Sequence, residues 1–318
     1  MPEKVLVTRE IPDAGLRPLE GFEVTVLSEA PPDRGDLLEA ARDAVGVLST
    51  VTEKIDGEFM DAAGEGLKVV ANMAVGYDNV SVEAANERGI VVTNTPGVLD
   101  ETTADVAFML LLAAARRLGE SERVLRAGRW EWWGPKLFMG PDVWGKKLGI
   151  VGLGRIGQAV ARRGRGFGME ILYHNRSRNE EAEEELQARY LDLDGLLETA
   201  DFVTVHTPLS DETHHFIGAE ELEKMKPEAV LVNTSRGPVV DEAALADALA
   251  EGRIFSAGLD VYEEEPKVNP KLLGLENVVL APHIGSGSIE TRDKMASLAA
   301  ENLVAVLRGG EPKTPVEA

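Results

Sequence analysis

The feature that most constrains this chain is a glycine-rich hexapeptide, G-x-G-x-x-G, at residues 152–157. Such hexapeptides also occur by chance, but here an aliphatic run at 148–151 precedes the loop and a helical pattern follows it. In a strand–loop–helix unit, Gly152 permits a tight turn, Gly154 lets the backbone approach a pyrophosphate, and Gly157 lets helix and strand pack closely. The helix N-terminus then offers backbone N–H groups to the phosphates. The sequence therefore predicts a dinucleotide-binding domain.

Short aliphatic runs alternate with helical segments on both sides of a break near residue 96. Runs of β-branched residues that are too short for helices, placed between helical segments, are typical of parallel α/β sheets. We therefore expect an α/β fold with two Rossmann-like or flavodoxin-like parallel-sheet domains. The predicted strands lie at 5–7, 24–26, 45–48, 69–70 and 90–92 before the break, and at 148–151, 171–173, 202–205, 230–232, 257–261 and 278–280 after it.

The two ends of the chain are expected to form one domain. Residues 101–117 are apolar over most of a helical circumference and predict a long, buried helix after the break. The last helical pattern, 289–308, cannot form a domain alone, so we expect it to pack on the N-terminal strands. This predicts a discontinuous substrate-binding domain at 1–99 plus 287–318 and a dinucleotide-binding domain at 100–286.

Composition excludes several classes of partner and site. The chain has 55 acidic and 33 basic residues, a formal net charge of -22. Because phosphate contacts need clustered Lys and Arg, we expect neither nucleic acid nor an anionic membrane as a partner. No apolar run reaches the roughly 18 residues of a membrane span, and the N-terminus lacks a secretory pattern. Without cysteine there are no disulfides or thiolate metal sites, so we expect no metal and a cytoplasmic location.

An acidic protein must bind an anionic dinucleotide through local devices that act within a Debye length of roughly 8 Å. The strand after the glycine loop normally ends in Asp or Glu, which hydrogen-bonds the ribose 2′-hydroxyl of NAD. Here Asn175 stands at that position, and Arg176, Ser177 and Arg178 follow it. An Asp would repel a 2′-phosphate, whereas Arg176 can pair with one. We therefore predict that NADPH is the preferred cofactor, with NAD possible.

Three polar residues follow predicted strands of the second series. Arg236, Glu265 and His283 each lie a few residues beyond the end of a different strand. Because ligands in open α/β sheets bind outside the carboxyl ends of the strands, these loops should face the dinucleotide. Taken singly, each residue has a plain explanation: a surface arginine, a solvated glutamate, and a histidine that caps a turn. Together, on this scaffold and in this order, they indicate a catalytic constellation.

Further motifs are spread along the chain: Val75-Gly76-Tyr77-Asp78-Asn79, Glu101-Thr102-Thr103-Ala104-Asp105 and His206-Thr207-Pro208-Leu209. With the glycine loop and the three polar segments, they resemble the D-isomer-specific 2-hydroxyacid dehydrogenase family, and within it the glyoxylate/hydroxypyruvate reductases. The resemblance implies two domains with a cleft between them and a homodimer. It also implies an NAD(P)H-dependent reductase of small 2-oxo acids, which converts glyoxylate and hydroxypyruvate to glycolate and D-glycerate.

By this resemblance, Arg236, Glu265 and His283 occupy the catalytic positions. Arg236 would hold the substrate carboxylate, and backbone N–H groups near Val75 and Gly76 would bind the same group. His283, as imidazolium, would protonate the ketone oxygen as a general acid. Glu265 would favour the charged form of His283. It is chosen over the two preceding glutamates because a proline follows it directly.

The predicted substrate is small. Leu48 begins a loop expected to contact it, and no arginine stands beside this loop to hold a phosphorylated substrate. The alternatives are another D-2-hydroxyacid dehydrogenase, such as D-lactate or phosphoglycerate dehydrogenase, and a non-catalytic, nucleotide-sensing corepressor of the same fold. Formate dehydrogenase is a further rival, but it carries Gln where Glu265 stands.

The resemblance also implies a wider set of cofactor contacts. Asp260 would hydrogen-bond the nicotinamide carboxamide, with a turn-capping role as the alternative. Trp130, Trp132 and Trp133 either shape a loop between subunits or pack in a core. The predicted cofactor-binding residues are Thr103, Gly152, Gly154, Arg155, Ile156, Gly157, Asn175, Arg176, Ser177, His206, Thr207, Pro208, Thr213, Thr234, Ser235, Asp260, His283 and Gly285.

Overall fold

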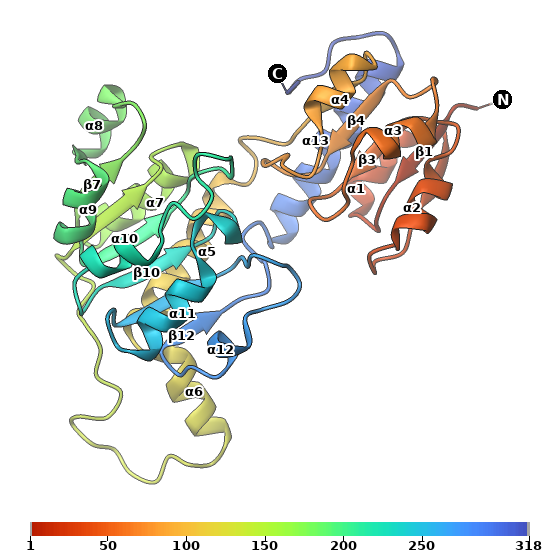
Figure 1. Cartoon of the computed structure of the whole chain (residues 1–318). Helices are drawn as coiled ribbons and strands as arrows, with labels where there is room; N and C mark the ends of the chain where they lie inside the picture. The colour runs from red at the N-terminus through yellow and green to blue at the C-terminus, as the bar shows by residue number, and fades with distance from the viewer. Residues whose placement is uncertain (1, 317–318) are drawn as a thin grey trace. The chain divides into compact units, whose positions relative to one another are not determined.

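The structure is a computed structural model that describes residues 2–316. The chain separates into two compact units, each with its own parallel sheet (Figure 1). The first unit joins the residues up to Leu99 with those from Ser286 onward, and the second unit runs from Asp100 to Gly285. The predicted α/β class with two parallel sheets is confirmed.

The strands of the first unit are β1 (Lys4–Val7), β2 (Glu23–Val26), β3 (Ala44–Ser49), β4 (Val69–Asn72) and β5 (Val91–Thr93). They form a five-stranded sheet in the order β2-β1-β3-β4-β5. All neighbours are parallel, and Val5 of β1 pairs with Val24 on one side and Gly46 on the other. This is the strand order of flavodoxin-like folds.

The helices of the first unit are α1 (Asp13–Leu16), α2 (Arg34–Ala41), α3 (Gly57–Ala63), α4 (Val82–Glu87) and α13 (Ile289–Leu307), with a 3-10 turn at Arg17–Leu19. Each of α2, α3, α4 and α13 follows an Asp or Ser whose side chain accepts a backbone N–H of the first turn. One core cluster joins α2, α3 and α4 to the sheet. The C-terminal helix α13 packs on β3, β4 and α1.

The strands of the second unit are β6 (Lys147–Val151), β7 (Glu170–His174), β8 (Arg189–Tyr190), β9 (Phe202–Val205), β10 (Val230–Asn233), β11 (Ser256–Leu259) and β12 (Val278–Leu280). They form a parallel sheet in the order β12-β11-β10-β9-β6-β7-β8. Because β6 lies between β7 and β9, the strand order reverses there. Doubly wound sheets bind their ligands at this reversal.

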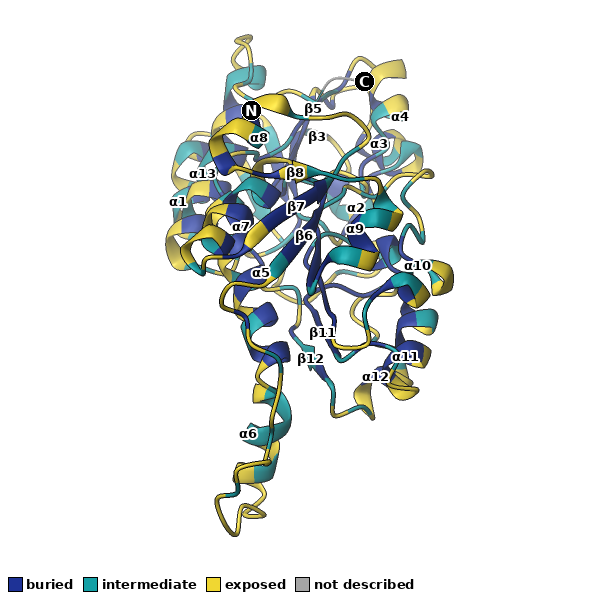
Figure 2. Cartoon of the chain, turned by 90° about the vertical axis from the view of Figure 1, so that its left-hand side faces the viewer, coloured by how far each residue is buried: buried dark blue, intermediate teal, exposed yellow. Residues whose placement is uncertain are grey.

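The helices of the second unit are α5 (Asp100–Ala115), α6 (Leu118–Arg126), α7 (Arg155–Gly166), α8 (Glu180–Leu186), α9 (Leu193–Thr199), α10 (Ala219–Lys224), α11 (Glu242–Ala250) and α12 (Pro270–Leu273), with a 3-10 turn at Gly237–Val239. Helices α5 and α7 pack in one core cluster, and α9, α10 and α11 pack in another. The strands between them are largely buried and dark blue in Figure 2.

Helix α6 and the loop after it extend away from the body of the second unit (Figures 1 and 2). We term residues 118–140 the arm. Its tryptophans Trp130, Trp132 and Trp133 are 52%, 68% and 77% exposed. The interpretation in which these three side chains pack in a core is therefore wrong for this chain.

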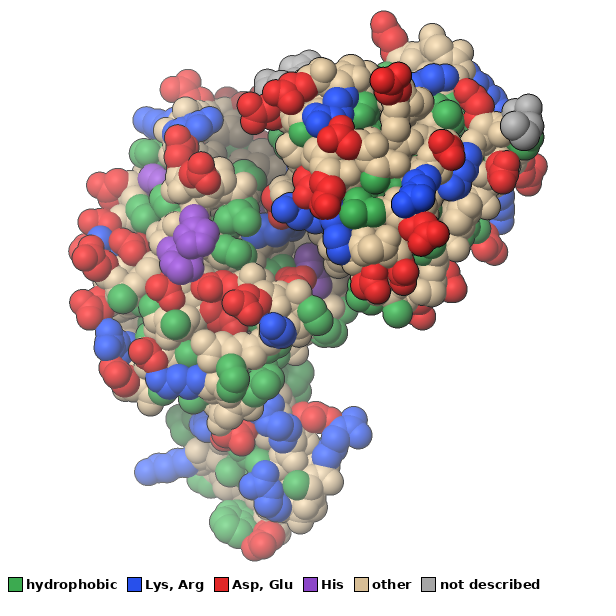
Figure 3. All heavy atoms as spheres, turned by 45° about the vertical axis from the view of Figure 1, so that its right-hand side comes forward, with side chains coloured by type: hydrophobic (Ala, Val, Ile, Leu, Met, Phe, Trp, Pro, Cys, Tyr) green, Lys and Arg blue, Asp and Glu red, His purple; other side chains and the backbone are tan. Residues whose placement is uncertain are grey.

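The acidic surplus lies on the surface. Figure 3 shows carboxylate side chains spread over the visible face and interspersed with Lys and Arg. In the described part of the chain, no helix is long and apolar enough to cross a membrane. The same residues contain no group of three or more His, Asp or Glu side chains that could hold a metal ion.

Candidate active site

The predicted site residues of the second unit follow the carboxyl ends of its strands. Gly152 follows β6, His206 follows β9, and Arg236 lies beyond β10. Asp260 follows β11, and His283 lies beyond β12. Because these strands are parallel neighbours, their carboxyl ends share one edge of the sheet. The loops that carry the predicted chemistry therefore begin side by side.

The glycine loop has the backbone that a phosphate-binding turn requires. Gly152 has a φ of +99°, and a Cβ built there would lie 2.8 Å from the carbonyl carbon of His206. A Cβ on Gly157 would collide with the carbonyl oxygen of Gly152. Neither position tolerates a side chain, because the loop, the helix and the β9 edge pack directly on one another.

Gly154 differs from these two glycines. A Cβ built on it meets no atom within 4 Å. Gly154 is also the N-cap of α7, and no side chain caps this helix. The first turn of α7 therefore presents backbone N–H groups beside open space, with Arg155 and Ile156 as its first residues. This arrangement fits the pyrophosphate of a dinucleotide.

The loop after β7 contains one residue that holds the glycine loop and two exposed arginines. Asn175 Oδ1 accepts a hydrogen bond from the backbone N of Leu153 at 2.7 Å, so it holds the glycine loop. Arg176 is exposed, and its Nη1 lies 3.6 Å from Glu212 Oε2. Arg178 instead pairs through Nε and Nη2 with both carboxylate oxygens of Glu183. Arg176 is therefore the more accessible of the two guanidinium groups.

Two buried polar atoms at the ends of β9 and β10 have no partner in the described chain: His206 Nδ1 and Thr234 Oγ1. The other ring nitrogen of His206, Nε2, lies 2.9 Å from Thr204 Oγ1. Although part of His206 reaches the surface, burial of its ring lowers the pKa to about 3, so the ring is neutral at physiological pH. Buried polar atoms without partners are rare in native proteins, and a bound ligand is one explanation.

His283 and Glu265 form a close pair. His283 Nδ1 lies 2.7 Å from Glu265 Oε2, and no partner of Nε2 is found among residues 2–316. Glu265 Oε1 also accepts the backbone N–H of Tyr262 at 3.1 Å. Burial alone would raise the pKa of Glu265, but the hydrogen bond from His283, that residue's charge, the N–H of Tyr262 and the charge of Arg236 together lower it. A charged Glu265 orients the ring with its proton on Nδ1.

The Arg236 loop packs against the loop that carries Glu265. A Cβ on Gly237 would collide with the backbone carbonyl of Tyr262, so only glycine permits this approach. Asn233 Nδ2 donates to the carbonyl oxygen of Arg236 at 2.9 Å, and Asn233 Oδ1 accepts from Ser235 N at 3.0 Å. The structure thus brings the loops of Arg236, Glu265 and His283 together.

In the first unit, Val75 and Gly76 follow β4. Their carbonyl oxygens accept hydrogen bonds from Asn94 Nδ2 at 2.9 Å and Asn72 Nδ2 at 3.0 Å. Within the described chain, their own N–H groups donate to no acceptor. The loop therefore commits its carbonyls to the protein and leaves two donors for an anion. Leu48 is fully buried in β3, so a substrate contact at this point would come from the loop that follows it.

Comparison with known proteins gives the family. A model of the NAD binding domain of D-isomer specific 2-hydroxyacid dehydrogenases matches residues 108–285. The chain is also 52% identical over 318 residues to a glyoxylate reductase of Thermococcus litoralis, with 98% of this chain and 96% of that one covered. This chain belongs to the D-isomer specific 2-hydroxyacid dehydrogenase family. The resemblance that the sequence motifs carry is confirmed.

Solved structures superpose on this chain over nearly its whole length. A Thermus thermophilus protein superposes with a TM-score of 0.93 at 48% identity, and covers 99% of this dehydrogenase and 100% of that chain. An NADPH-dependent glyoxylate/hydroxypyruvate reductase of Sinorhizobium meliloti, solved with NADP and malonate, superposes with a TM-score of 0.88 at 41% identity. That match covers 99% of this chain and 97% of the other.

Asp260 has a structural role in this dehydrogenase. It is 1% exposed, and burial raises the pKa of its carboxyl group despite two backbone hydrogen bonds. Its Oδ1 and Oδ2 accept the backbone N–H groups of Ile284 and Gly285, each at 2.7 Å. Asp260 thereby fixes the turn after His283, which is the capping alternative raised from the sequence. A contact with the carboxamide stays a prediction, because each oxygen can accept a second bond.

Other predicted cofactor residues of this dehydrogenase hold their own loops. Thr207 Oγ1 donates to the carbonyl of Val151 at 3.2 Å. Thr213 Oγ1 donates to the carbonyl of Pro208 at 2.6 Å and accepts the N–H of Ser210 at 2.8 Å. These bonds shape the loop after β9 beside the glycine loop.

Sequence reasoning missed the residues that support the Glu265 loop. The Glu242 carboxylate accepts the backbone N–H groups of Glu263 at 2.9 Å and Asn269 at 2.7 Å. In return, Glu263 Oε1 accepts the N–H of Glu242 at 2.8 Å and lies 3.1 Å from His215 Nε2. The only signal in the sequence was an acidic residue at the start of a helix, which is too common to single out.

Proposed function

We propose that this dehydrogenase is an NAD(P)H-dependent reductase of small 2-oxo acids, which converts glyoxylate to glycolate and hydroxypyruvate to D-glycerate. The observation that carries the proposal is the 2.7 Å pair between His283 Nδ1 and Glu265 Oε2, because it orients Nε2 as a proton donor. The relatives support the substrate class. Those of Thermococcus litoralis and Korarchaeum cryptofilum, 52% and 54% identical to this chain, are glyoxylate reductases.

Proton transfer is the task of His283. When bound, the reduced nicotinamide supplies a hydride to the carbonyl carbon next to the carboxylate. Negative charge then develops on the carbonyl oxygen, and His283 Nε2 donates a proton to it. Glu265 stabilises the imidazolium before the transfer and keeps the proton on Nδ1 afterwards. The hydride and the proton together convert the C=O group to a hydroxyl, and the reverse steps oxidise the 2-hydroxy acid.

Binding of the substrate carboxylate is the task of Arg236 and of backbone donors. A guanidinium pairs with a carboxylate through two parallel hydrogen bonds and fixes its orientation. The N–H groups of Val75 and Gly76 have no acceptor within residues 2–316, so they too are suited to bind a carboxylate. Contacts with the carboxylate hold the neighbouring carbonyl group in a reactive orientation.

We infer that NADPH is preferred over NADH. Asn175 braces the glycine loop in place of the carboxylate that would repel a 2′-phosphate. Arg176 is exposed beside it, and Ser177 is exposed next in the chain. The Sinorhizobium meliloti structure, an NADPH-dependent reductase solved with NADP, is consistent with this preference.

We also infer a homodimer that uses the arm. Besides its tryptophans, the arm exposes Leu118, Leu125 and Met139, which are 57%, 58% and 61% accessible. Exposed apolar patches on a projecting element mark a surface for association. A second copy of the chain is the simplest partner, because most soluble oligomers are symmetric homo-oligomers.

A spectrophotometric panel tests the function. Several 2-oxo acids are supplied with NADPH and with NADH, and oxidation of D- and L-glycerate serves as the reverse assay. The proposal predicts turnover with glyoxylate and hydroxypyruvate, oxidation of D-glycerate only, and a higher kcat/KM with NADPH. Binding of NADPH without turnover of any 2-oxo acid would favour the corepressor alternative.

A further inference from the structure

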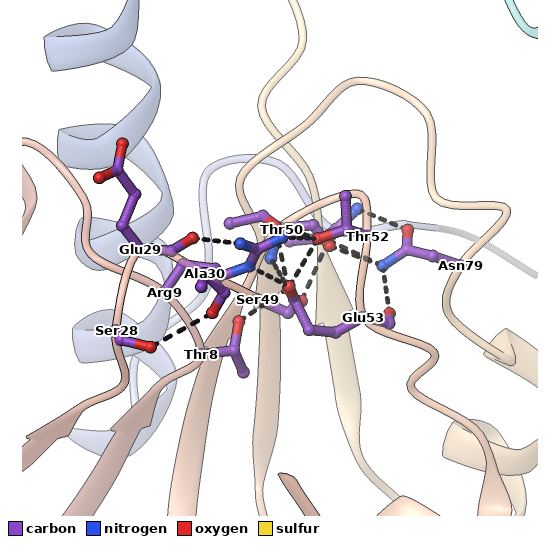
Figure 4. Close-up of polar contacts among 11 residues, drawn as sticks. Thr8, Arg9, Ser28, Glu29, Ala30, Ser49, Thr50, Thr52, Glu53 and Asn79 are labelled. Atoms are coloured by element: carbon purple, nitrogen blue, oxygen red, sulfur yellow. Dashed lines mark hydrogen bonds and ion pairs between the residues drawn. The ribbon is translucent and has the colours of Figure 1, made fainter. Parts of the chain in front are cut away.

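A buried carboxylate in the first unit is not used by the chemistry above. Glu53 is 4% exposed and accepts hydrogen bonds from several donors (Figure 4). Oε2 accepts Thr8 Oγ1, Thr50 N and Thr50 Oγ1, each at 2.9 Å. Oε1 accepts Arg9 Nε at 2.7 Å and Thr52 Oγ1 at 2.6 Å. The Glu53 side chain therefore ties the loop after β3 to the end of β1.

Glu53 is ionised despite its burial. Burial alone would raise the pKa of Glu53, but hydrogen bonds from Thr52, Arg9, Thr50 and Thr8 outweigh it and lower the pKa. The side chains of Arg9 and Glu53 are only 15% and 3% exposed, so they form a largely buried ion pair. Such a pair rarely stabilises a fold more than apolar packing would. Its presence at the carboxyl ends of β1 and β3 therefore indicates that the geometry of these loops is kept fixed.

Asn79 extends this network to the loop after β4. Its Nδ2 donates to the carbonyls of Thr50 at 2.8 Å and Glu53 at 3.0 Å. Its Oδ1 accepts Asn72 Nδ2 at 3.1 Å, and the same nitrogen of Asn72 lies 3.0 Å from the carbonyl of Gly76. Hydrogen bonds and the backbone of Thr50 therefore link the Glu53 carboxylate, through Asn79 and Asn72, to Gly76, whose own N–H is one of the two uncommitted donors.

We propose that Glu53 is a positioning residue, which acts through Thr50 and Asn79 to fix the N–H donors of Val75 and Gly76 for the carboxylate of the 2-oxo acid. This inference rests on the proposed function, because it takes the 2-oxo acid as the anion. Donors that are already held in place lose less conformational freedom when an anion binds, so a rigid brace behind two backbone donors strengthens binding of the carboxylate.

The test compares Glu53→Gln with the wild type. Gln has the same shape, but its NH2 group must face a donor, so the network loosens. We expect the KM for glyoxylate to rise about tenfold while kcat changes less than about threefold. The Kd for NADPH, measured by its fluorescence, should stay at the wild-type value. In the ligand-free protein, hydrogen exchange in peptides that span 48–55 and 73–80 should become faster.

Two further variants keep the test decisive. Thr8→Val removes a single donor to Glu53, and should change the KM and the exchange in the same direction but less, even if Glu53→Gln does not fold. Leu37→Ala removes a buried side chain of α2 that is 4% exposed and lies in the same unit. It should lower the Tm and leave the KM and the exchange of both peptides unchanged.

The outcomes separate this inference from the function on which it rests. An active wild type with an unchanged KM in Glu53→Gln and Thr8→Val would overturn the positioning role. An equal rise of the KM in Leu37→Ala would overturn it too, because it would show that general loosening is sufficient. A wild type that reduces no 2-oxo acid would refute the proposed function instead, and the exchange data would then still report whether Glu53 fixes the two loops.

Discussion

The proton-donating ring of His283 depends on the carboxylate of Glu265 beside it. The pKa of Glu265 is lowered from its ordinary value of 4.5 because the hydrogen bond from His283 and nearby charges outweigh burial. The stability that this ionised carboxylate contributes is therefore present above its ordinary pKa. It is lost as the pH falls through the lowered pKa of the folded protein. Across the neutral range, the pair is therefore intact.

Removal of that carboxylate should lower kcat. In Glu265→Gln, His283 loses the oxygen that accepts its Nδ1 proton, so the ring is no longer held with Nε2 as the donor. We expect kcat for glyoxylate at neutral pH to fall about 10²-fold or more. Steady-state kinetics of the variant and the wild type measure this loss. An unchanged kcat would remove Glu265 from the mechanism.

Arg176 gives the residue-scale test of cofactor choice. Arg176→Gln should raise the KM for NADPH about tenfold and leave that for NADH unchanged, because only NADPH carries the 2′-phosphate. Arg189→Gln is a matched control: this arginine is also exposed and pairs with Glu170 at 3.2 Å. Equal losses with both cofactors would indicate a structural role for Arg176.

At the scale of elements, two glycines of the β6–loop–α7 unit allow the effects on cofactor binding and on stability to be measured separately. Gly154→Ala adds a methyl group in open space, so the Tm should change little, whereas the Kd for NADPH should rise about tenfold because the methyl group blocks the pyrophosphate. Gly157→Ala places a methyl group against the Gly152 carbonyl and should lower the Tm. Calorimetry and fluorescence titration measure the pair. Retained NADPH affinity in Gly154→Ala would mean that the phosphates lie elsewhere.

The arm is the second element with a testable role. If it joins two copies of the chain, Trp132→Ser with Trp133→Ser should convert the dimer to a monomer in analytical ultracentrifugation, because aromatic anchors dominate interface energies. Trp144→Ser is the control, since this tryptophan is 72% exposed but lies outside the arm. A wild-type monomer at micromolar concentration would refute the homodimer.

Periodicity was enough to predict most elements but not their ends. The aliphatic runs of both sheets and the long helix at 101–117 were visible as patterns. That helix ends at Ala115 because Arg117 takes a left-handed φ of 52°, after which α6 begins. Nothing in the sequence marks that turn. The two-residue strand β8 is too short to produce a pattern at all.

The candidate site, too, could be predicted from the sequence only in part. Strand ends and motifs pointed to Arg236, Glu265 and His283, whose loops the structure brings together. The supporting bonds could not be predicted, because they join residues far apart in sequence. Thr8 and Glu53 are separated by 45 positions, and Asp260 and Gly285 by 25. Side chains that act by bracing carry no local signature of their role.

At the scale of the whole molecule, a net charge of -22 repels both an anionic cofactor and an anionic substrate. This repulsion acts over tens of ångströms at low salt, whereas the contacts of Arg236 and the α7 N-terminus act at short range. We therefore expect kcat/KM for glyoxylate to rise, by about twofold, as ionic strength increases from about 0.01 M to 0.15 M. Steady-state assays in a salt series measure it. A steep fall would show that long-range attraction dominates instead.

The central claim is that His283 donates the proton in reduction of a 2-oxo acid at the sheet edge that binds the dinucleotide. The most direct test is kcat for glyoxylate in His283→Ala, measured beside the Kd for NADPH. The account predicts that kcat falls about 10²- to 10⁴-fold while the Kd changes less than about threefold. Near-wild-type turnover in this variant, with NADPH still bound, would contradict it.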